Sequence, residues 1–371
     1  LNGDRDKRRQ VLRLYLGALA ENRLSAKDPF ADDRFRADFP NWNWVGGTVL
    51  EDPEAPSGPR LIEVVDASDT ANVYAWTSLL IPIQAGIDYS FSWKAKTDGV
   101  HDYSVTVSQY DAHHDWLSGK NLDFIRTGNG EWQSENVTMS DSALDTKARA
   151  VRIYLWARPW TEGGVTKGRT FFDDIFFAAS GVPTNAVANG DFDMAAEDIG
   201  IDIDFSAFDD AAAFALDLLG ADSFDLPLPG FASGYQDAFT GGQLLSFAWG
   251  TPDYETLFGR LLRAVDDHLA SRGWLDRAYV YWYDEPVETR YEDLIDGMRL
   301  LNEADPRLQR FLTEQAEAEL LGSVDIWDSR LDFYSPGWAW PRQAVGEQVW
   351  WYVCTGPRSP YPTNFIDYPG P

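Results

Sequence analysis

Two acidic residues, Asp284 and Glu285, stand side by side directly after the aromatic run at residues 278–283 and directly before Pro286. The run is short, apolar and rich in residues that favour β-structure, so it predicts a buried strand. Pro286 ends that strand because proline has no N–H to donate to the ladder. Carboxylates at the carboxyl end of a buried parallel strand lie where α/β barrels hold their catalytic groups. Because the chain contains 59 Asp and Glu residues, a solvated acidic turn is the alternative interpretation.

The adjacency of the two carboxylates favours one kind of glycoside hydrolysis. In ordinary retaining glycosidases the two catalytic carboxylates come from separate strands and lie about 5 Å apart on either side of the bond. Two sequence neighbours are better suited to a substrate that supplies its own nucleophile, such as the carbonyl oxygen of a 2-acetamido group. One carboxylate then orients the acetamide and stabilises its developing positive charge, while the other protonates the leaving oxygen and later activates water.

Other predicted strand ends and their neighbours carry further acidic and aromatic side chains. The candidate substrate-binding residues are Asp225, Tyr283, Glu314, Trp327, Asp328, Trp351 and Tyr352. Carboxylates surrounded by Trp and Tyr fit glycoside hydrolysis better than acyl or phosphoryl transfer. The four His residues are scattered and form neither a triad pattern nor a metal motif.

The elements that position these residues alternate between strand and helix. A helix is predicted over residues 4–22, and from about residue 200 strands and helices follow one another, with strands centred near residues 24, 224, 280, 310, 325 and 350. This alternation predicts parallel strands joined by right-handed crossovers. We therefore expect a (β/α)8 TIM-type barrel that is incomplete at both ends, one strand lying before residue 1 and one after residue 371. An open doubly wound sheet is the alternative, although no Gly-rich phosphate loop supports it.

Between about residues 33 and 180 the pattern changes to short alternating segments separated by Gly, Asp, Asn and Ser. Strands are predicted at residues 60–65, 73–80, 89–94, 103–110, 149–156 and 170–177. This spacing is typical of an all-β sandwich. The expected domains are residues 1–32, the first part of the catalytic barrel; residues 33–182, an inserted β-sandwich placed after the second barrel strand; and residues 183–371, the remainder of the barrel.

Composition limits the classes of partner. A net charge of -28 opposes binding to nucleic acid or to an anionic membrane surface, and no apolar run is long enough to span a bilayer. Aromatic residues make up 14% of the chain, with 16 Trp, more than a core needs, which favours ligands such as sugar rings. The chain begins without Met or a signal-like apolar segment, so we interpret it as a processed chain or a fragment, and expect a secreted, periplasmic or cell-surface protein. The oligomeric state is not predicted.

At the acidic pair a family resemblance becomes visible. Residues 281–286, Tyr-Trp-Tyr-Asp-Glu-Pro, resemble the catalytic strand of glycoside hydrolase family 123, the β-N-acetylgalactosaminidases, and residues 350–357 with 361–369 are similar to that family's late-strand signature. The resemblance covers about residues 5–30 and 200–371. It implies that Asp284 stabilises the acetamido group, that Glu285 is the acid and base, and that catalysis uses no cofactor.

The middle segment resembles carbohydrate-binding modules of the jelly-roll kind. Residues 81–96, residues 130–132 and the Phe-Phe-Asp-Asp-Ile run at residues 171–175 carry this resemblance. It implies a structural calcium ion at Asp173 and Asp174, with ordinary solvated carboxylates as the alternative.

Three functions remain open from the sequence. The first is removal of terminal β-linked N-acetylgalactosamine, or another N-acetylhexosamine, from a glycan by the acetamide-assisted route. The second is a glycosidase of other sugar specificity that pairs a more distant carboxylate, Glu314 or Asp328, with the acidic pair. The third is a non-catalytic protein in which the sandwich binds glycans.

Overall fold

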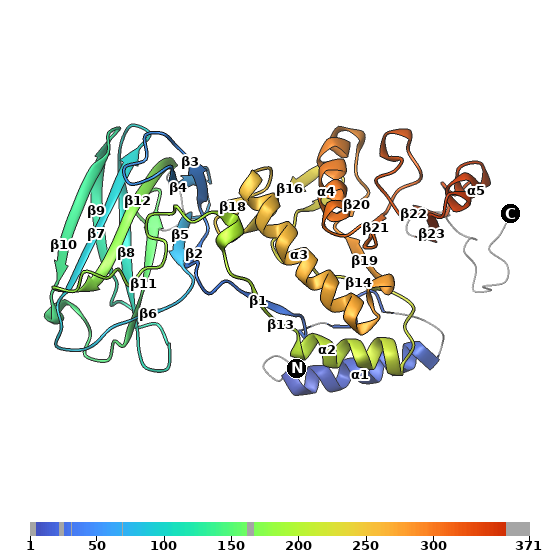
Figure 1. The fold of residues 1–371 in the computed structure, drawn as a ribbon, viewed down its shortest axis with the longest axis horizontal. Coiled ribbons are helices and arrows are strands. Elements are labelled where there is room, and N and C mark those ends of the chain that lie inside the picture. The colour runs from blue at the N-terminus through green and yellow to red at the C-terminus, as the bar shows by residue number, and fades with distance from the viewer. Residues whose placement is uncertain (1–4, 22–25, 31, 69, 162–166, 354–371) are drawn as a thin grey trace. The chain divides into compact units, whose positions relative to one another are not determined.

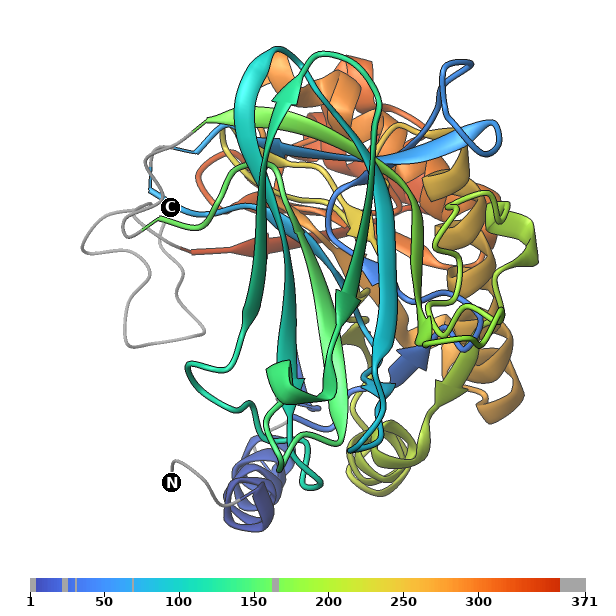
Figure 2. The ribbon, with the colours of Figure 1, turned by 90° about the vertical axis from the view of Figure 1, so that its left-hand side faces the viewer.

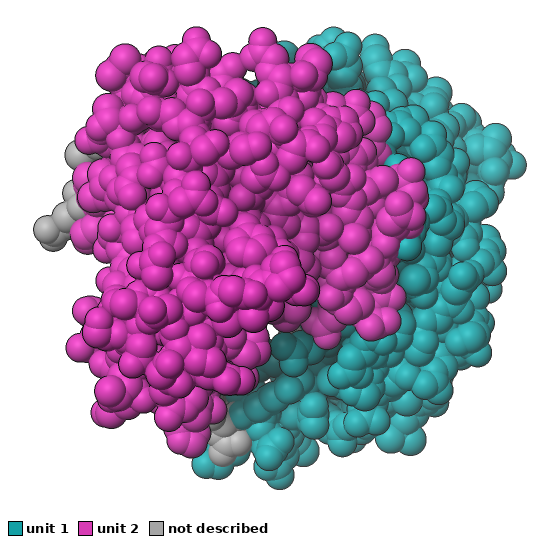
Figure 3. Space-filling view, turned by 60° about the vertical axis from the view of Figure 1, so that its left-hand side comes forward, with its two compact units in different colours: residues 1–37, 203–242, 255–371 teal, residues 38–202, 243–254 magenta. Residues whose placement is uncertain are grey.

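The computed structural model describes residues 5–21, 26–30, 32–68, 70–161 and 167–353. The chain divides into two compact units, coloured separately in Figure 3. Unit 1 comprises residues 1–37, 203–242 and 255–371, and unit 2 comprises residues 38–202 and 243–254. The paired strands β1 (Arg36–Asp38) and β13 (Asp202–Asp204) include the residues at which the chain leaves unit 1 and returns to it.

Unit 2 is a sandwich of two antiparallel sheets (Figures 1 and 2). One sheet has the order β10 (Gln133–Met139), β7 (Tyr89–Thr97), β12 (Gly168–Ala179), β4 (Arg60–Asp66) and β3 (Thr48–Glu51). The other has the order β2 (Trp44–Val45), β5 (Tyr74–Thr77), β11 (Ala150–Trp156), β8 (Val100–Tyr110) and β9 (Leu122–Asn129), with β6 (Ile81–Pro82) paired to β11. A β-sandwich in this part of the chain is therefore confirmed.

Aromatic side chains fill the space between the two sheets. The ring of Trp93 on β7 lies 5.7 Å from Phe124 on β9, and Tyr103 on β8 lies 5.7 Å from Phe172 on β12. Alternate residues of β7 are buried, as the period of a strand requires. A short hairpin of β17 (Gln243–Leu244) and β18 (Phe247–Ala248) belongs to the same unit, with Phe247 packed against Trp42 at a ring distance of 5.0 Å.

Unit 1 is built on one parallel sheet of five strands in chain order. The strands are β14 (Phe224–Asp225), β19 (Ala278–Tyr281), β21 (Gln309–Leu312), β22 (Ile326–Arg330) and β23 (Gln348–Tyr352). Helix α3 (Pro252–Arg272) precedes β19, α4 (Tyr291–Ala304) precedes β21, and α5 (Pro336–Ala344) precedes β23. The predicted strand–helix alternation and parallel pairing are confirmed for this part of the chain.

Two further helices stand outside this alternation. Helix α1 (Arg5–Glu21) lies where the sequence predicts a helix, and α2 (Ser206–Ala212) continues into a wider π-helical turn over Ala213–Leu218. Among the described helices, none combines the length and apolar character that crossing a bilayer requires.

The prediction of an eight-stranded barrel is wrong for the described residues. The sheet is curled but has five strands, ordered from β14 to β23 (Figure 1). The predicted strand near residue 24 lies partly outside the described residues. Residues 26–30 form no strand, and the Asp225 N–H of β14 donates to the Lys27 carbonyl at 2.9 Å. Pro29 lies in this segment and lacks the N–H that a ladder needs. Residues 26–30 therefore border the sheet and do not supply the barrel strand that their composition predicts.

The strand that leads to the acidic pair is interrupted. The predicted strand at residues 278–286 breaks at Trp282 into β19 and β20 (Tyr283–Asp284). Strand β20 leaves the main sheet and pairs in parallel with β15 (Ser233–Tyr235), which itself pairs with β16 (Ala238–Thr240). The two halves of the aromatic run therefore belong to different sheets, and Asp284 ends the second of them.

The main sheet has one aromatic face and one face packed on helix α4. Tyr279, Phe311 and Ile326 form the buried centre of the first face, with Tyr281 and Trp350 packed against them. Trp282 lies on the other face, where a Cβ built on Gly297 of α4 would be only 2.4 Å from its ring. Glycine at residue 297 therefore allows α4 to pack closely on the sheet.

Candidate active site

Asp284 is held at the end of β20 by contacts to its backbone and its side chain. Its carbonyl accepts the N–H of Gln236 at 2.9 Å, and its Oδ1 accepts the Thr313 hydroxyl at 2.8 Å. The Tyr281 hydroxyl also hydrogen-bonds the Asp284 carboxylate, and burial is the main cause that raises the pKa of Tyr281. Two hydroxyl groups, those of Thr313 and Tyr281, therefore contact the Asp284 carboxylate.

Glu285 adopts a left-handed backbone conformation with φ of 47°. Such a conformation costs a non-glycine residue about 1–2 kcal/mol, and it also breaks the alternation by which neighbours in a strand point to opposite faces. The Glu285 N–H donates to Thr313 Oγ1 at 2.9 Å, and its Oε1 accepts a hydrogen bond from the Tyr352 hydroxyl. The turn therefore allows Asp284 to reach Thr313, directly after β21, and Glu285 to reach Tyr352 on β23.

Two more carboxylates lie within electrostatic reach of this pair. Burial raises the pKa of Asp328 to about 6, and the charge of Asp284 adds to the increase. Burial raises the pKa of Glu314 to about 7; the Gln315 N–H opposes this, whereas the charges of Glu317 and Glu285 add to it. Carboxyl groups with such pKa values near neutral pH are typical of sites that transfer protons.

Asp225 lies at the end of β14, one strand away from Tyr281. Its Oδ1 accepts the Tyr281 N–H at 3.1 Å, and Lys27 Nζ lies 3.6 Å from its Oδ2 and 3.8 Å from the centre of the Tyr281 ring. Burial raises the pKa of Asp225 to about 6, against the lowering effects of the Tyr281 N–H and of Lys27. A cavity of about 290 Å³ is lined by Asp225, Tyr281 and Arg34, among others.

The structure therefore brings together five predicted site residues through direct contacts or electrostatic reach: Asp284, Glu285, Glu314, Asp328 and Tyr352. Asp225 joins them through Tyr281. Sequence analysis missed Tyr281 and Thr313. Thr313 directly follows the carboxyl end of an apolar strand, and this position is the signal that identified Glu314. The same signal could have identified Thr313.

Three predicted substrate-binding residues lie elsewhere. Trp327 is fully buried, and its Nε1 donates to Glu347 Oε2 at 2.6 Å. Tyr283 is fully buried, and its hydroxyl donates to the Gln236 carbonyl at 3.0 Å. Trp351 is 56% exposed and alternates with Tyr352, so the two side chains leave β23 on opposite faces. Trp350 instead packs on the aromatic face, with its ring 5.5 Å from Phe311.

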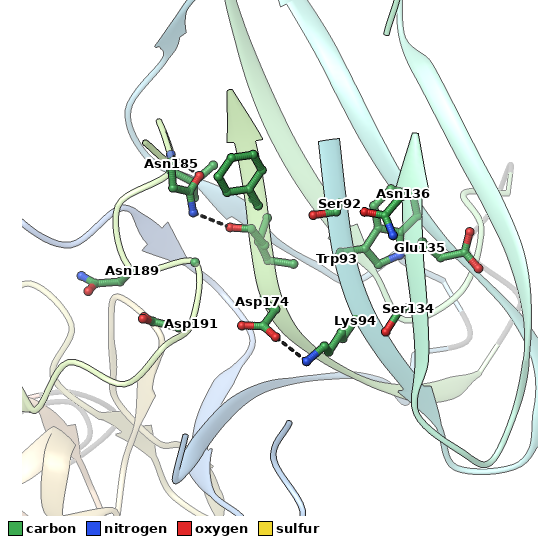
Figure 4. Close-up of a pocket in the computed structure, with 14 residues that line it drawn as sticks. Ser92, Trp93, Lys94, Ser134, Glu135, Asn136, Asp174, Asn185, Asn189 and Asp191 are labelled. Carbon is green, nitrogen blue, oxygen red and sulfur yellow. Dashed lines mark hydrogen bonds and ion pairs between the residues drawn. The ribbon is translucent and has the colours of Figure 1, made fainter. Parts of the chain in front are cut away.

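The predicted calcium ligands in unit 2 already have protein partners. Asp173 is fully buried; it accepts hydrogen bonds from the Ser57 hydroxyl at 2.9 Å and from the Asp174 N–H at 2.7 Å. Asp174 forms an ion pair with Lys94 at 2.6 Å (Figure 4). Calcium takes roughly six to eight oxygen ligands, and among the described residues no group of three or more His, Cys, Asp and Glu is placed to hold a metal ion. This geometry gives no support to calcium at Asp173 and Asp174, which stays a prediction.

Unit 2 also carries an open groove of about 730 Å³ on the sheet that contains β11 and β8. Aromatic side chains line it: Tyr74, Tyr110, Trp116, Tyr154, Trp156 and Trp160. Its floor is ordered by hydrogen bonds, because Trp156 Nε1 donates to Thr106 Oγ1 at 3.1 Å, and the Thr106 hydroxyl donates to Asp123 at 2.6 Å. None of the described lining residues is Lys or Arg.

Comparison with known proteins gives one family match. Residues 231–370 match the model of the glycoside hydrolase 123 catalytic domain. This range contains Asp284, Glu285, Thr313, Asp328 and Tyr352. It continues past residue 353, where the described residues end, so Cys354 and residues 361–369 of the predicted late signature lie outside the described part of the chain. None of the curated proteins matches the chain.

Solved structures of carbohydrate-binding modules show partial likeness to the chain. A family 4 module (CBM4) is 16% identical, with 37% of this chain and 95% of that chain covered and a TM-score of 0.27. The N-terminal cellulose-binding domain of Cellulomonas fimi β-1,4-glucanase C is 14% identical, with 37% and 89% covered and a TM-score of 0.27. The CBM22-1 xylan-binding domain of Paenibacillus barcinonensis Xyn10C is 14% identical, with 39% and 85% covered and a TM-score of 0.27.

Scores this low do not identify the sandwich, whose two-sheet architecture rests on its own strand pairing. The family match is the comparison that bears on function. The matched range includes the acidic pair of Asp284 and Glu285, and the match supports glycoside hydrolase activity for this part of the chain.

Proposed function

We propose that unit 1 removes a terminal β-linked N-acetylgalactosamine, or a closely related N-acetylhexosamine, from glycans, with the substrate's own 2-acetamido group as nucleophile. One observation carries the proposal: the neighbours Asp284 and Glu285 share the Thr313 hydroxyl as a partner, so both belong to one site. Two adjacent carboxylates suit this route because neither has to attack the sugar from the opposite face.

In the first step the acetamido carbonyl oxygen attacks C1 and the bond from C1 to the leaving oxygen breaks. Ionised Asp284 accepts the acetamido N–H and stabilises the positive charge of the oxazolinium ring that forms. Protonated Glu285 gives its proton to the leaving oxygen, so the leaving group departs as a neutral alcohol. Asp284 is suited to its role by the hydroxyl groups that already donate to it.

In the second step water attacks C1 from the side that the leaving group vacated. Glu285, now ionised, takes a proton from that water, and the ring opens to regenerate the acetamide. Two displacements at C1 retain the β configuration, and the enzyme returns to its starting protonation state. The Tyr352 hydroxyl holds the Glu285 carboxylate between the two steps.

The test uses an aryl β-N-acetylgalactosaminide as substrate and the variants Glu285→Gln and Asp284→Asn. Each variant is expected to lose at least about 100-fold in kcat, the lower range for loss of a general acid–base group. Glu288→Gln, which changes a nearby Glu outside the site contacts described above, is the matched control and keeps the wild-type rate. Near-normal turnover by Glu285→Gln would sink the proposal.

A glycosidase of other sugar specificity is the second candidate function for unit 1. The observation that favours it is the pKa of Glu314, raised to about 7 mainly by burial. Such a group could act as proton donor while another carboxylate attacks the sugar. A thiazoline analogue of N-acetylgalactosamine separates the two functions, because tight inhibition is expected of the acetamide-assisted route alone.

For unit 2 we propose that the aromatic groove binds the glycan chain. Open aromatic rings suit the apolar C–H faces of sugars, and Asp123, Asn121 and the groove hydroxyls offer partners to sugar hydroxyl groups. Trp116 and Trp160 are 49% and 64% exposed, so their replacement by Ala spares the core. Loss of glycan-array binding by Trp116→Ala and Trp160→Ala, but not by Trp340→Ala at an exposed Trp of unit 1, is expected. Unchanged binding in all three would contradict this function.

A further inference from the structure

Thr313 is the side chain that contacts both members of the acidic pair. It follows β21 and is 7% exposed. Its Oγ1 lies 2.8 Å from Asp284 Oδ1 and 2.9 Å from the Glu285 backbone nitrogen. Among the described hydrogen bonds, no other side chain reaches both residues, since Tyr281 contacts Asp284 and Tyr352 contacts Glu285.

The direction of the two hydrogen bonds follows from the chemistry of the groups. The Glu285 N–H can only donate, so Thr313 Oγ1 accepts there. The hydroxyl proton of Thr313 is therefore left for Asp284, whose ionised carboxylate can only accept. A single hydroxyl thus links the charge of Asp284 to the backbone position of Glu285.

The second bond acts on a residue whose conformation is unfavourable by itself. Glu285 has a positive φ of 47° without being glycine, and such residues persist where surrounding contacts hold them. The bond from its N–H to Thr313 is one such contact, and it acts on the backbone rather than on the side chain. Removal of the hydroxyl would release this backbone contact and one donor to Asp284 at once.

We propose that Thr313 is a positioning residue that aims Asp284 at the acetamido N–H while it holds the Glu285 turn in its working conformation. The proposal rests on the proposed function of unit 1. Four other titratable side chains lie around Asp284: Tyr281 of β19, its sequence neighbour Glu285, Asp328 of β22 and Tyr352 of β23. Thr313 differs from them because it is uncharged at every working pH, so its loss isolates the hydrogen bonds.

The test compares Thr313→Val, which removes the hydroxyl at nearly constant shape, with Thr313→Ser, which keeps it. A hydrogen bond to a charged group corresponds to roughly a 10- to 100-fold change in rate. We expect Thr313→Val to lose that much in kcat, and Thr313→Ser to stay within about threefold of the wild type. Ser329→Ala, which removes a buried hydroxyl on β22 that contacts its own neighbour's carbonyl, is the matched control and keeps the wild-type rate.

A purely structural role would not make Thr313→Val distinguish ligands with the acetamide from ligands without it. Binding of the thiazoline analogue weakens in the Val variant, whereas binding of galactose, which lacks the acetamide, does not change. If Thr313→Val does not fold, Thr313→Ala takes its place with the same readouts.

The outcomes separate this inference from the function on which it rests. Near-normal turnover by Glu285→Gln overturns both. An inactive Glu285→Gln variant, together with wild-type kcat and wild-type binding of the thiazoline analogue in Thr313→Val, overturns the role of Thr313 alone. The combination of a slow Val variant, weakened binding of the thiazoline analogue and rescue by Ser supports it.

Discussion

The Tyr352 hydroxyl on β23 donates a hydrogen bond to the Glu285 carboxylate, which lies 67 residues earlier in the chain. Glu285 lies in the turn after β20, which continues from β19, and in the main sheet β21 and β22 lie between β19 and β23. The departure of β20 from the main sheet and the curl of that sheet together bring the two side chains into contact. The curvature of the sheet therefore takes part in building the site, although the sheet has five strands and no eight-stranded barrel is formed in the described residues.

Tyr352→Phe tests this contact. The variant removes the donor to Glu285 and keeps the ring, so kcat should fall by about 3- to 10-fold, as for loss of one ordinary hydrogen bond. Tyr334→Phe, in the turn after β22, is the control and keeps the wild-type kcat. A wild-type kcat in Tyr352→Phe would contradict a direct role of the contact.

Glu314→Gln tests whether Glu314 is a catalytic group or only a carboxylate close to the site. Burial raises the pKa of Glu314 to about 7, which makes Glu314 the competing candidate for the proton donor. We expect kcat at pH 5 to fall by less than about 10-fold, because Glu314 holds no bond to the substrate in the acetamide-assisted route. Complete loss of turnover in Glu314→Gln, with turnover retained in Asp284→Asn, would instead favour the second glycosidase mechanism.

Asp266 on α3 gives a prediction for stability. Its side chain is buried, neither carboxyl oxygen has a hydrogen-bond partner among the described residues, and burial raises its pKa to about 8. A folded-state pKa above the unfolded value of 3.8 means that this group favours folding most below pH 4, and that this advantage is lost as the pH rises to about 8. The free energy of unfolding should therefore fall between these values.

Asp266→Asn should flatten this decline, with a gain on the order of a few kcal/mol at pH 8 relative to the wild type. Urea unfolding at pH 5 and pH 8 measures it, with Asp267→Asn at the exposed neighbouring position as the control. An equal pH dependence in the wild type and Asp266→Asn would show that Asp266 is ionised in the folded protein or exchanges its proton with another group.

Much of the fold could be predicted because alternation and strand–helix order are local properties of the sequence. Six strands of the sandwich were predicted close to their observed positions, whereas β9 and β10 were missed because their outward residues are polar and their apolar residues are sparse. Closure of a barrel is not local. It depends on whether a segment such as residues 26–30 forms a full ladder, and strand-like composition does not decide that.

The site was predicted in part, because position at a strand end is also a local property of the sequence. That position identified Asp284, Glu285 and Asp328, but it does not tell which side chains of a strand point to which face of the sheet. Trp350, Trp351 and Tyr352 are all aromatic, so composition could not show that Trp351 leaves β23 on the opposite face. The positive φ of Glu285, which lets two sequence neighbours share one site, also has no composition signal when the residue is Glu rather than Gly.

The most direct test of the central claim is the inhibition constant of the thiazoline analogue of N-acetylgalactosamine, measured on the wild type and on Asp284→Asn. The account predicts inhibition at least about 100-fold tighter than by galactose, since transition-state analogues bind at least this much more tightly than ground-state ligands. Most of that advantage should be lost in Asp284→Asn. Equal inhibition by the thiazoline and by galactose, in an enzyme that turns over the aryl glycoside, would contradict catalysis by the substrate's acetamide.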